Sequence, residues 1–184
     1  MKPGRLIIIS APSGGGKTSV IQRLLKKYPE MIHSVSWTTR SRRPQEIDAK
    51  DYHFVSPAAF KKGIQENGFA EWAQVHDAHY GTPKAPLEKW LKEGREVLLD
   101  LDVQGAMNLK KIFAKQAVTI FLLPPSEEEL ERRLHERKTD SLEERRIRLR
   151  NAKKEMEQRG RYDYQVVNSD LEQACQEIEK IMKS

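Results

Sequence analysis

The sequence has little of what marks secreted, membrane-spanning or disulfide-bonded chains. Cysteine occurs once in 184 residues, as Cys175, so no internal disulfide can form and a reducing compartment is expected. No apolar run approaches the roughly 20 residues that span a bilayer. The apolar stretch at 6–9 is also too short for a signal peptide. We therefore expect a cytoplasmic protein without a membrane partner.

Motifs for hydrolytic and zinc chemistry are lacking as well. His76 and His79 form an HxxH pair, but they lie in a polar stretch without cysteines or a partnered glutamate helix. No Ser/His/Asp or Cys/His arrangement suggests a hydrolase, and there is no internal repeat or low-complexity linker. These absences exclude a zinc site and a hydrolase as working hypotheses.

Positive charge is what the sequence has instead. The formal net charge is +6, and much of the excess is arginine. Arginine contacts phosphate through parallel N–H groups, so the composition suits an anionic ligand. Charge alone does not distinguish an RNA backbone from a nucleotide.

Apolar runs that alternate with helical patterns predict an α/β fold. The runs at 6–9, 97–99 and 118–123 are typical of buried parallel strands. We expect a three-layer domain over 1–184 with a central parallel sheet covered on both faces. Two insertions interrupt it, at 36–85 and 126–158. The core segments are then 1–35, 86–125 and 159–184.

Smaller signals place individual elements. Ser126 and Glu129 form a capping-box pattern that predicts the start of a charged helix. The last core strand is expected at 164–167. The aromatic side chains of Phe69 and Trp72 are expected to be buried.

A phosphate-binding loop is the first motif that carries chemistry. Residues 11–18 read APSGGGKT and fit the P-loop pattern except at Ala11, where the strict pattern has glycine. The loop lies between a predicted strand and a predicted helix, whose N-terminus favours anions. Lys17 would reach the β- and γ-phosphates, and the Thr18 hydroxyl would ligate Mg²⁺. The motif predicts that ATP is bound by Ser13, Gly14, Gly15, Gly16, Lys17, Thr18 and Ser19.

Two carboxylates follow the second buried run. Asp100 ends the stretch 97–99, where P-loop enzymes hold a carboxylate near Mg²⁺. Asp102 would point to the same side if the strand continued. We therefore expect Mg²⁺ as the cofactor, bound by Thr18 and Asp100 directly or through water.

The first insertion carries the most specific pattern. It contains SVSWTTR at 34–40, RPQE at 43–46, KDY at 50–52, EWA at 71–73 and YGT at 80–82. This ordered series resembles the guanylate kinase family, and the resemblance extends from the phosphate loop to Asn168. It implies a P-loop NTPase fold and an ATP-dependent transferase that phosphorylates GMP to GDP in purine metabolism. Gln45 and Lys138 depart from the pattern, because the family usually has glycine there.

The resemblance also implies which residues bind GMP within the insertion at 36–85. The GMP phosphate would be held by Arg40, Arg43, Tyr52 and Tyr80. The guanine edge would be read by Ser36, Glu71 and Thr82, with Asp102 beside them and Asp100 nearer Mg²⁺ and the phosphates. A carboxylate suits guanine, because its N1–H and N2–H₂ groups both donate on one edge.

The insertion at 126–158 corresponds to the family's lid. Arg133 and Arg137 share one helix face at a spacing of four residues, and Arg148 lies on the next helix. By resemblance these arginines close over the ATP phosphates, and Asn168 lies near the adenosine. The residues expected to act in catalysis are Lys17, Arg40, Asp100, Arg133, Arg137 and Arg148.

Three other interpretations compete with this one. A guanylate-kinase-like interaction domain without catalysis is disfavoured because Lys17 and Arg133 are present. A related P-loop kinase of another small phosphorylated acceptor is disfavoured by Glu71 and Thr82. An RNA-binding role lacks a matching module, so we expect no nucleic-acid partner. The resemblance leaves a homo-oligomer and the use of dGMP open.

Overall fold

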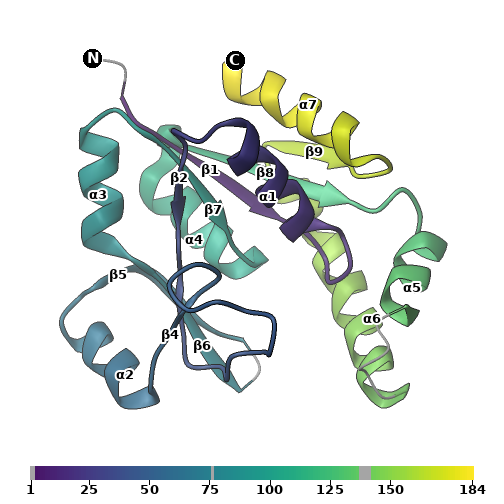
Figure 1. The fold of residues 1–184 in the computed structure, drawn as a ribbon, viewed down its shortest axis with the longest axis horizontal. Helices are drawn as coiled ribbons and strands as arrows, with labels where there is room; N and C mark the ends of the chain where they lie inside the picture. The colour runs from purple at the N-terminus through teal and green to yellow at the C-terminus, as the bar shows by residue number, and fades with distance from the viewer. Residues whose placement is uncertain (1–2, 76, 137–141) are drawn as a thin grey trace. The chain divides into compact units, whose positions relative to one another are not determined.

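The computed structural model describes residues 3–75, 77–136 and 142–184. The chain folds into two compact units, one formed by Met1–Ile8 and Glu30–Val118 and the other by Ile9–Pro29 and Thr119–Ser184. In chain order the elements are β1 (Arg5–Ser10), α1 (Lys17–Lys27), β2 (Ile32–Ser34), β3 (Trp37–Thr38), β4 (His53–Phe54), α2 (Pro57–Gln65), β5 (Phe69–Val75), β6 (Ala78–Pro83), α3 (Lys84–Lys92), β7 (Glu96–Asp100), α4 (Val103–Phe113), η1 (Ala114–Gln116), β8 (Ala117–Leu123), α5 (Glu127–His135), α6 (Leu142–Glu157), η2 (Gln158–Arg161), β9 (Tyr164–Val167) and α7 (Leu171–Lys183) (Figure 1).

The larger sheet has the strand order β2-β7-β1-β8-β9. Its pairs β2–β7 and β8–β9 are parallel, with Ile32 opposite Val97 and Ile120 opposite Tyr164. The central apolar residues of β1, β7 and β8 have 0% exposed surface, as expected for strands covered on both faces. The prediction of an α/β fold with a parallel sheet is thus confirmed, and so are the bounds of the strand at 164–167.

The first unit also contains a smaller sheet with the order β4-β3-β6-β5. Its strands β5 and β6 form an antiparallel hairpin in which Glu71 lies opposite Thr82. Side chains alternate along β5, so Glu71 is 7% exposed whereas Trp72 is 43% exposed. The prediction that Trp72 is buried is therefore wrong, because strand alternation places the carboxylate inside and the indole outside. Phe69, which was also expected to be buried, is only partly buried, and it stacks on Phe60 at 4.6 Å between ring centroids.

In the second unit α1 and α7 lie side by side (Figure 1). The helices α5 and α6 share a small core in which Leu130 and Leu134 pack with Ala152. Ser126 caps α5 as predicted, because its Oγ accepts the Glu129 N–H at 3.2 Å. The Glu129 carboxylate turns instead to arginines of the same helix. Among the described residues, no helix combines the length and the apolar character needed to cross a membrane.

Candidate active site

A tight loop with two obligatory glycines follows β1. Gly14 and Gly16 have φ angles of 86° and 85°, in the left-handed region where other side chains are strained. Gly16 is the N-cap of α1, and no side chain caps this helix. Ala11 is not among the described residues with positive φ, so its backbone does not require glycine. The loop therefore offers the uncapped positive end of a helix to an anion.

The other predicted ATP residues belong to this loop and the first turn of α1. That turn begins with Lys17, Thr18 and Ser19, of which the last two are exposed. The Gly15 N–H donates to the Pro12 carbonyl at 2.8 Å and closes a turn. The Ser13 N–H donates to Oε2 of Glu155 at 3.3 Å. Glu155 lies on α6, and sequence reasoning assigned it no role.

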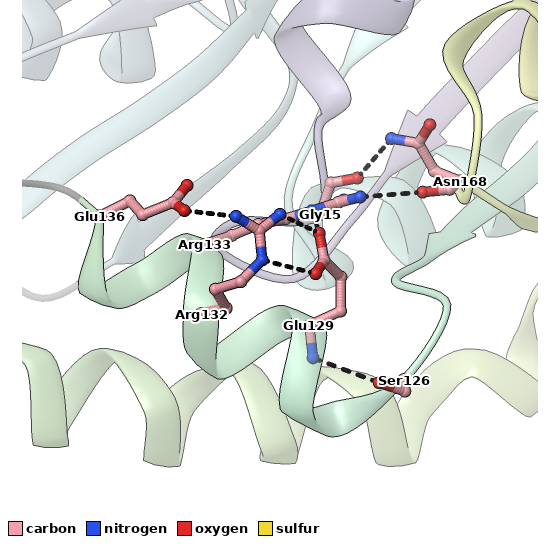
Figure 2. Close-up of polar contacts among 7 residues, drawn as sticks. All are labelled: Gly15, Ser126, Glu129, Arg132, Arg133, Glu136 and Asn168. Atoms are coloured by element: carbon pink, nitrogen blue, oxygen red, sulfur yellow. Dashed lines mark hydrogen bonds and ion pairs between the residues drawn. The ribbon is translucent and has the colours of Figure 1, made fainter.

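Asn168 joins the loop to the end of β9 (Figure 2). Its Nδ2 donates to the Gly15 carbonyl at 2.9 Å, and the residue is buried. A Cβ on Gly16 would lie only 2.3 Å from this Nδ2, which is a second reason why glycine is needed there. The structure thus places the Asn168 amide on the phosphate loop, and its contact with adenosine stays a prediction.

Arg133 is held on two sides next to the same loop. Its Nε donates to Oε1 of Glu129 at 2.8 Å, and its Nη2 donates to the Asn168 carbonyl at 3.2 Å (Figure 2). Its Nη1 lies 3.9 Å from where a Cβ on Gly16 would be. The structure therefore places Arg133 next to the phosphate loop, and its action as a lid arginine stays a prediction.

Two further lid arginines, Arg137 and Arg148, are predicted from the resemblance. Arg148 lies on α6, which packs against α5. Arg137 and the departure Lys138 lie outside the described residues. Arg133 thus lies next to the phosphate loop, and the roles of Arg137 and Arg148 stay predictions.

In the first unit, the predicted phosphate-binding residues of the GMP site gather around Arg40. Its Nε donates to the Tyr80 hydroxyl at 3.2 Å, and its guanidinium carbon lies 5.6 Å from the Tyr52 ring centroid. The rings of Tyr52 and Tyr80 lie 5.8 Å apart. However, both terminal nitrogens of Arg40 already donate to the Glu46 carboxylate, Nη1 to Oε2 at 3.0 Å and Nη2 to Oε1 at 2.7 Å. These are the N–H groups that bidentate phosphate binding would use.

Glu46 also organises the turn that carries Arg43. Its Oε2 accepts the Arg43 N–H at 2.8 Å, and the Arg43 side chain is half exposed. Burial alone would raise the pKa of Glu46, but the hydrogen bonds from Arg40 and from the Arg43 backbone lower it below its ordinary value. The same ion pair raises the pKa of Arg40. Gln45 lies exposed in this turn and is not among the described residues with positive φ, so the turn does not require the family's glycine.

The predicted guanine-binding residues include a buried carboxylate. Oε1 of Glu71 accepts a hydrogen bond from the Thr82 hydroxyl at 2.7 Å across the β5–β6 hairpin. Burial raises the pKa of Glu71 to about 7; the Thr82 hydrogen bond lowers it in part, and the charge of Asp102 raises it further. Ser36 is also buried, in the segment before β3.

Asp102 lies at the start of α4 rather than on a continued strand. The strand β7 ends at Asp100, and Asp102 is the N-cap of α4, where Oδ1 accepts the Gly105 N–H at 2.7 Å. A Cβ on Gly105 would lie 3.1 Å from Oε2 of Glu71 and 3.2 Å from Oδ1 of Asp102. The two carboxylates therefore converge on the first turn of α4, at a glycine that sequence reasoning did not single out.

Within the described ranges, no group of three or more His, Cys, Asp or Glu side chains gathers around a possible metal position. His76 of the HxxH pair lies outside these ranges. Mg²⁺ commonly binds through few protein oxygens, with substrate phosphates and water completing its shell. Thr18 is exposed in the first turn of α1, and its hydroxyl oxygen could serve as one of these Mg²⁺ ligands.

Three functional candidates received no role in the site from the sequence: Glu46, Glu129 and Gly105. Each is visible in the sequence, but its role depends on a partner brought close by the fold. The signal that could have found Glu46 is its place between Arg43 and the KDY motif. Glu129 was noticed only as part of a capping box.

Known proteins are similar to this chain over nearly its whole length. The model of the family described as "Guanylate kinase" matches residues 3–184. A curated guanylate kinase from Syntrophotalea carbinolica is 49% identical, over 97% of this chain and 85% of that relative. A second, from Zymomonas mobilis, is 44% identical over 97% of this chain and 83% of the relative.

Solved structures agree as well. The crystal structure of guanylate kinase from Anaplasma phagocytophilum superposes with a TM-score of 0.83 at 33% identity, covering 100% of this chain and 86% of that one. A gluconokinase from Sinorhizobium meliloti superposes with a TM-score of 0.53 at 15% identity, covering 100% of this chain and 96% of that one. At 15% identity, the similarity to the gluconokinase shows a shared fold and nothing more.

Proposed function

This chain belongs to the guanylate kinase family, and from that premise we propose which of its residues carry out the reaction. The protein is a nucleoside monophosphate kinase that transfers a phosphoryl group from ATP to GMP and releases ADP and GDP. Its α/β fold with a parallel central sheet is the fold of its solved relative. The observation that carries the assignment of the acceptor is the buried Glu71 carboxylate bonded to Thr82.

The ATP phosphates bind at the loop before α1. The N–H groups around Gly14, Gly15 and Gly16 and the positive end of α1 receive the β- and γ-phosphates, and Lys17 neutralises their charge. Support comes from the uncapped helix start and from Arg133, whose Nη1 is directed at Gly16. Arg148 and Arg137 add charge from the lid. Ser13, Thr18, Ser19 and Asn168 complete the ATP site.

GMP binds in the first unit. Its phosphate contacts Arg40, Arg43, Tyr52 and Tyr80. Its guanine edge donates to Glu71, with Ser36, Thr82 and Asp102 as further polar partners. Adenine presents an acceptor at N1, which would leave the Glu71 carboxylate facing a lone pair in a buried site. Selection of guanine over adenine therefore follows from one buried carboxylate.

The residues present fit a requirement for Mg²⁺. Thr18 and Asp100 would hold it directly or through water, and the remaining ligands would be phosphate oxygens and water. When bound, the ion neutralises negative charge on the β- and γ-phosphates.

No side chain needs to act as a general base. A GMP phosphate oxygen is already anionic and attacks the γ-phosphorus, while the bond from that phosphorus to the bridging oxygen of ADP breaks. Lys17, Arg40 and Arg133 neutralise the charge of the transferring group. The protein supplies positioning and excludes water.

A coupled assay of ADP release, with ATP, Mg²⁺ and a panel of GMP, AMP, CMP and UMP, tests this function. We expect turnover with GMP alone. Glu71→Gln should raise KM for GMP far more than KM for ATP, whereas the exposed Glu66→Gln is the matched control and should change neither. Turnover with none of the four nucleotides, together with retained ATP binding, would instead favour another phosphorylated acceptor.

A further inference from the structure

The carboxylate of Glu129 connects two neighbouring arginines that differ in surroundings (Figure 2). It accepts from Arg132 through both oxygens, Nε–Oε2 at 2.8 Å and Nη2–Oε1 at 2.7 Å. It also accepts from Arg133 Nε at 2.8 Å. Arg132 is exposed and has Glu136 as a second carboxylate partner. Arg133 is mostly covered, with 23% of its side chain exposed.

Arg133 is anchored so that one end of its guanidinium stays available. A guanidinium has five N–H groups. One at Nε is bound by Glu129, and one at Nη2 is bound by the Asn168 carbonyl. Among the described residues, nothing accepts from Nη1, the nitrogen that lies 3.9 Å from a Cβ position on Gly16. The anchors thus point an N–H pair at the phosphate loop.

Glu129 is well suited to be such an anchor. Hydrogen bonds from Arg132 and Arg133 lower the pKa of its carboxyl to about 2, so it stays ionised at any working pH. Its backbone is fixed by the Ser126 cap, and its helix is fixed by Leu130 and Leu134 in the core shared with α6. The second anchor, Asn168, is tied to Gly15 of the loop itself.

We propose that Glu129 is a positioning residue that holds Arg133 with Nη1 directed at the phosphates of ATP. The inference rests on the proposed function of Arg133 as a phosphate ligand. An arginine that is already oriented loses little rotamer freedom when charge develops on the transferring phosphoryl group. Glu129 therefore raises the rate without contacting a substrate.

The first test compares kcat and KM in Glu129→Gln with two matched controls. Glu136→Gln removes the other carboxylate partner of Arg132, and Glu128→Gln removes another first-turn charge of α5. We expect Glu129→Gln to lower kcat about 10- to 100-fold, with KM for GMP unchanged. Both controls should stay within about 2-fold of the wild type. Equal kcat values for all three variants would overturn the proposal.

The second test is a double-mutant cycle with Arg133→Gln. If Glu129 acts only through Arg133, then Glu129→Gln should cause no further loss of kcat in the Arg133→Gln background. The same fold-loss in both backgrounds would mean that Glu129 acts elsewhere, and the proposal would be wrong. An inactive wild type would instead contradict the proposed function.

A third variant guards against simple unfolding. Glu129→Asp keeps a first-turn charge on α5, but the shorter side chain retracts the carboxylate from Arg133. We expect it to match the wild type in thermal denaturation and Glu129→Gln in kcat. Wild-type kcat in a folded Glu129→Asp protein would count against positioning.

Discussion

The two units of the chain treat their arginines in opposite ways. In the first unit, Nη1 and Nη2 of Arg40 both donate to the Glu46 carboxylate, and Nε of Arg40 donates to the Tyr80 hydroxyl. In the second unit, Glu129 and the Asn168 carbonyl hold Arg133 by Nε and Nη2. In the second unit, the proposed ATP half, Nη1 of Arg133 thus has no acceptor among the described residues. In the first unit, the proposed GMP half, described acceptors bind Nε, Nη1 and Nη2 of Arg40. A carboxylate beside an arginine can therefore have two effects. It can orient the guanidinium while leaving N–H groups open to a ligand, or it can bind the N–H groups that the ligand would use.

The largest effect on activity should come from Gly16→Ala, in the phosphate loop of the second unit. The new Cβ would lie 2.3 Å from Nδ2 of Asn168, at a φ of 85° that alanine rarely adopts. We expect kcat/KM for ATP to fall by at least about 100-fold, because both the loop and its tie to Asn168 must shift. Steady-state kinetics with varied ATP measures this. A near-normal kcat/KM would show that the loop does not need its observed conformation.

Glu46→Gln tests the first unit, where the Glu46 carboxylate binds Arg40. The amide keeps a similar shape but loses the charge that fixes Arg40 and the Arg43 N–H. We expect KM for GMP to rise about 30-fold while KM for ATP is unchanged, since hydrogen bonds to charged groups contribute roughly 1.5–3 kcal/mol. Calorimetric titration with GMP gives the same quantity directly. Tighter GMP binding would mean that Glu46 competes with the phosphate rather than organising its site.

The pH dependence of GMP binding distinguishes the halves in another way. The pKa of Glu71 is raised to about 7, so this carboxyl is mostly protonated below that value and accepts guanine donors only above it. KM for GMP should fall about 10-fold between about pH 6 and about pH 8, beyond the change caused by the phosphate of GMP itself. In Glu71→Gln only the titration of the GMP phosphate remains, so the variant should show only the change in KM that this phosphate causes. An identical pH profile in the variant would contradict the assignment.

The smallest effect is expected from Gly105→Ala, the counterpart of Gly16→Ala in the GMP half. Its Cβ would lie 3.1 Å from Oε2 of Glu71 and 3.2 Å from Oδ1 of Asp102, so both carboxylates must move by a few tenths of an ångström. We expect KM for GMP to rise about 5-fold with kcat nearly unchanged, because small side-chain displacements cost about 1 kcal/mol. Gly160→Ala, at a site with open space around it, is the control. A loss equal to that of Gly16→Ala would mean that the GMP half is as rigid as the loop.

Features set by local sequence were predicted well. The strand bounds at 164–167 and the buried apolar runs follow from composition over a few residues, and the phosphate loop follows from glycine and lysine spacing. Trp72 was misplaced because the segment at 69–82 has no helical period, and its strand alternation becomes evident only once the hairpin register is known.

Features set by tertiary contacts could not be predicted. Glu46 and Glu129 are equally plausible as solvated surface charges, and only the fold shows which nitrogens of an arginine each one binds. The raised pKa of Glu71 depends on its burial and on the charge of Asp102 nearby, which no spacing rule reports. Sequence reasoning therefore proposed the candidate site residues but not the contacts that set their electrostatics.

The division of the chain into units also has a consequence for protein synthesis. The phosphate loop, at 11–16, is translated well before residues 119–184, which complete its unit. Both Arg133 and Asn168 belong to that late segment, which takes several seconds to translate at about 5–20 residues per second. The residues of the GMP half, 30–118, are all made before it. On the nascent chain, the first unit can therefore form while the second unit still lacks residues 119–184.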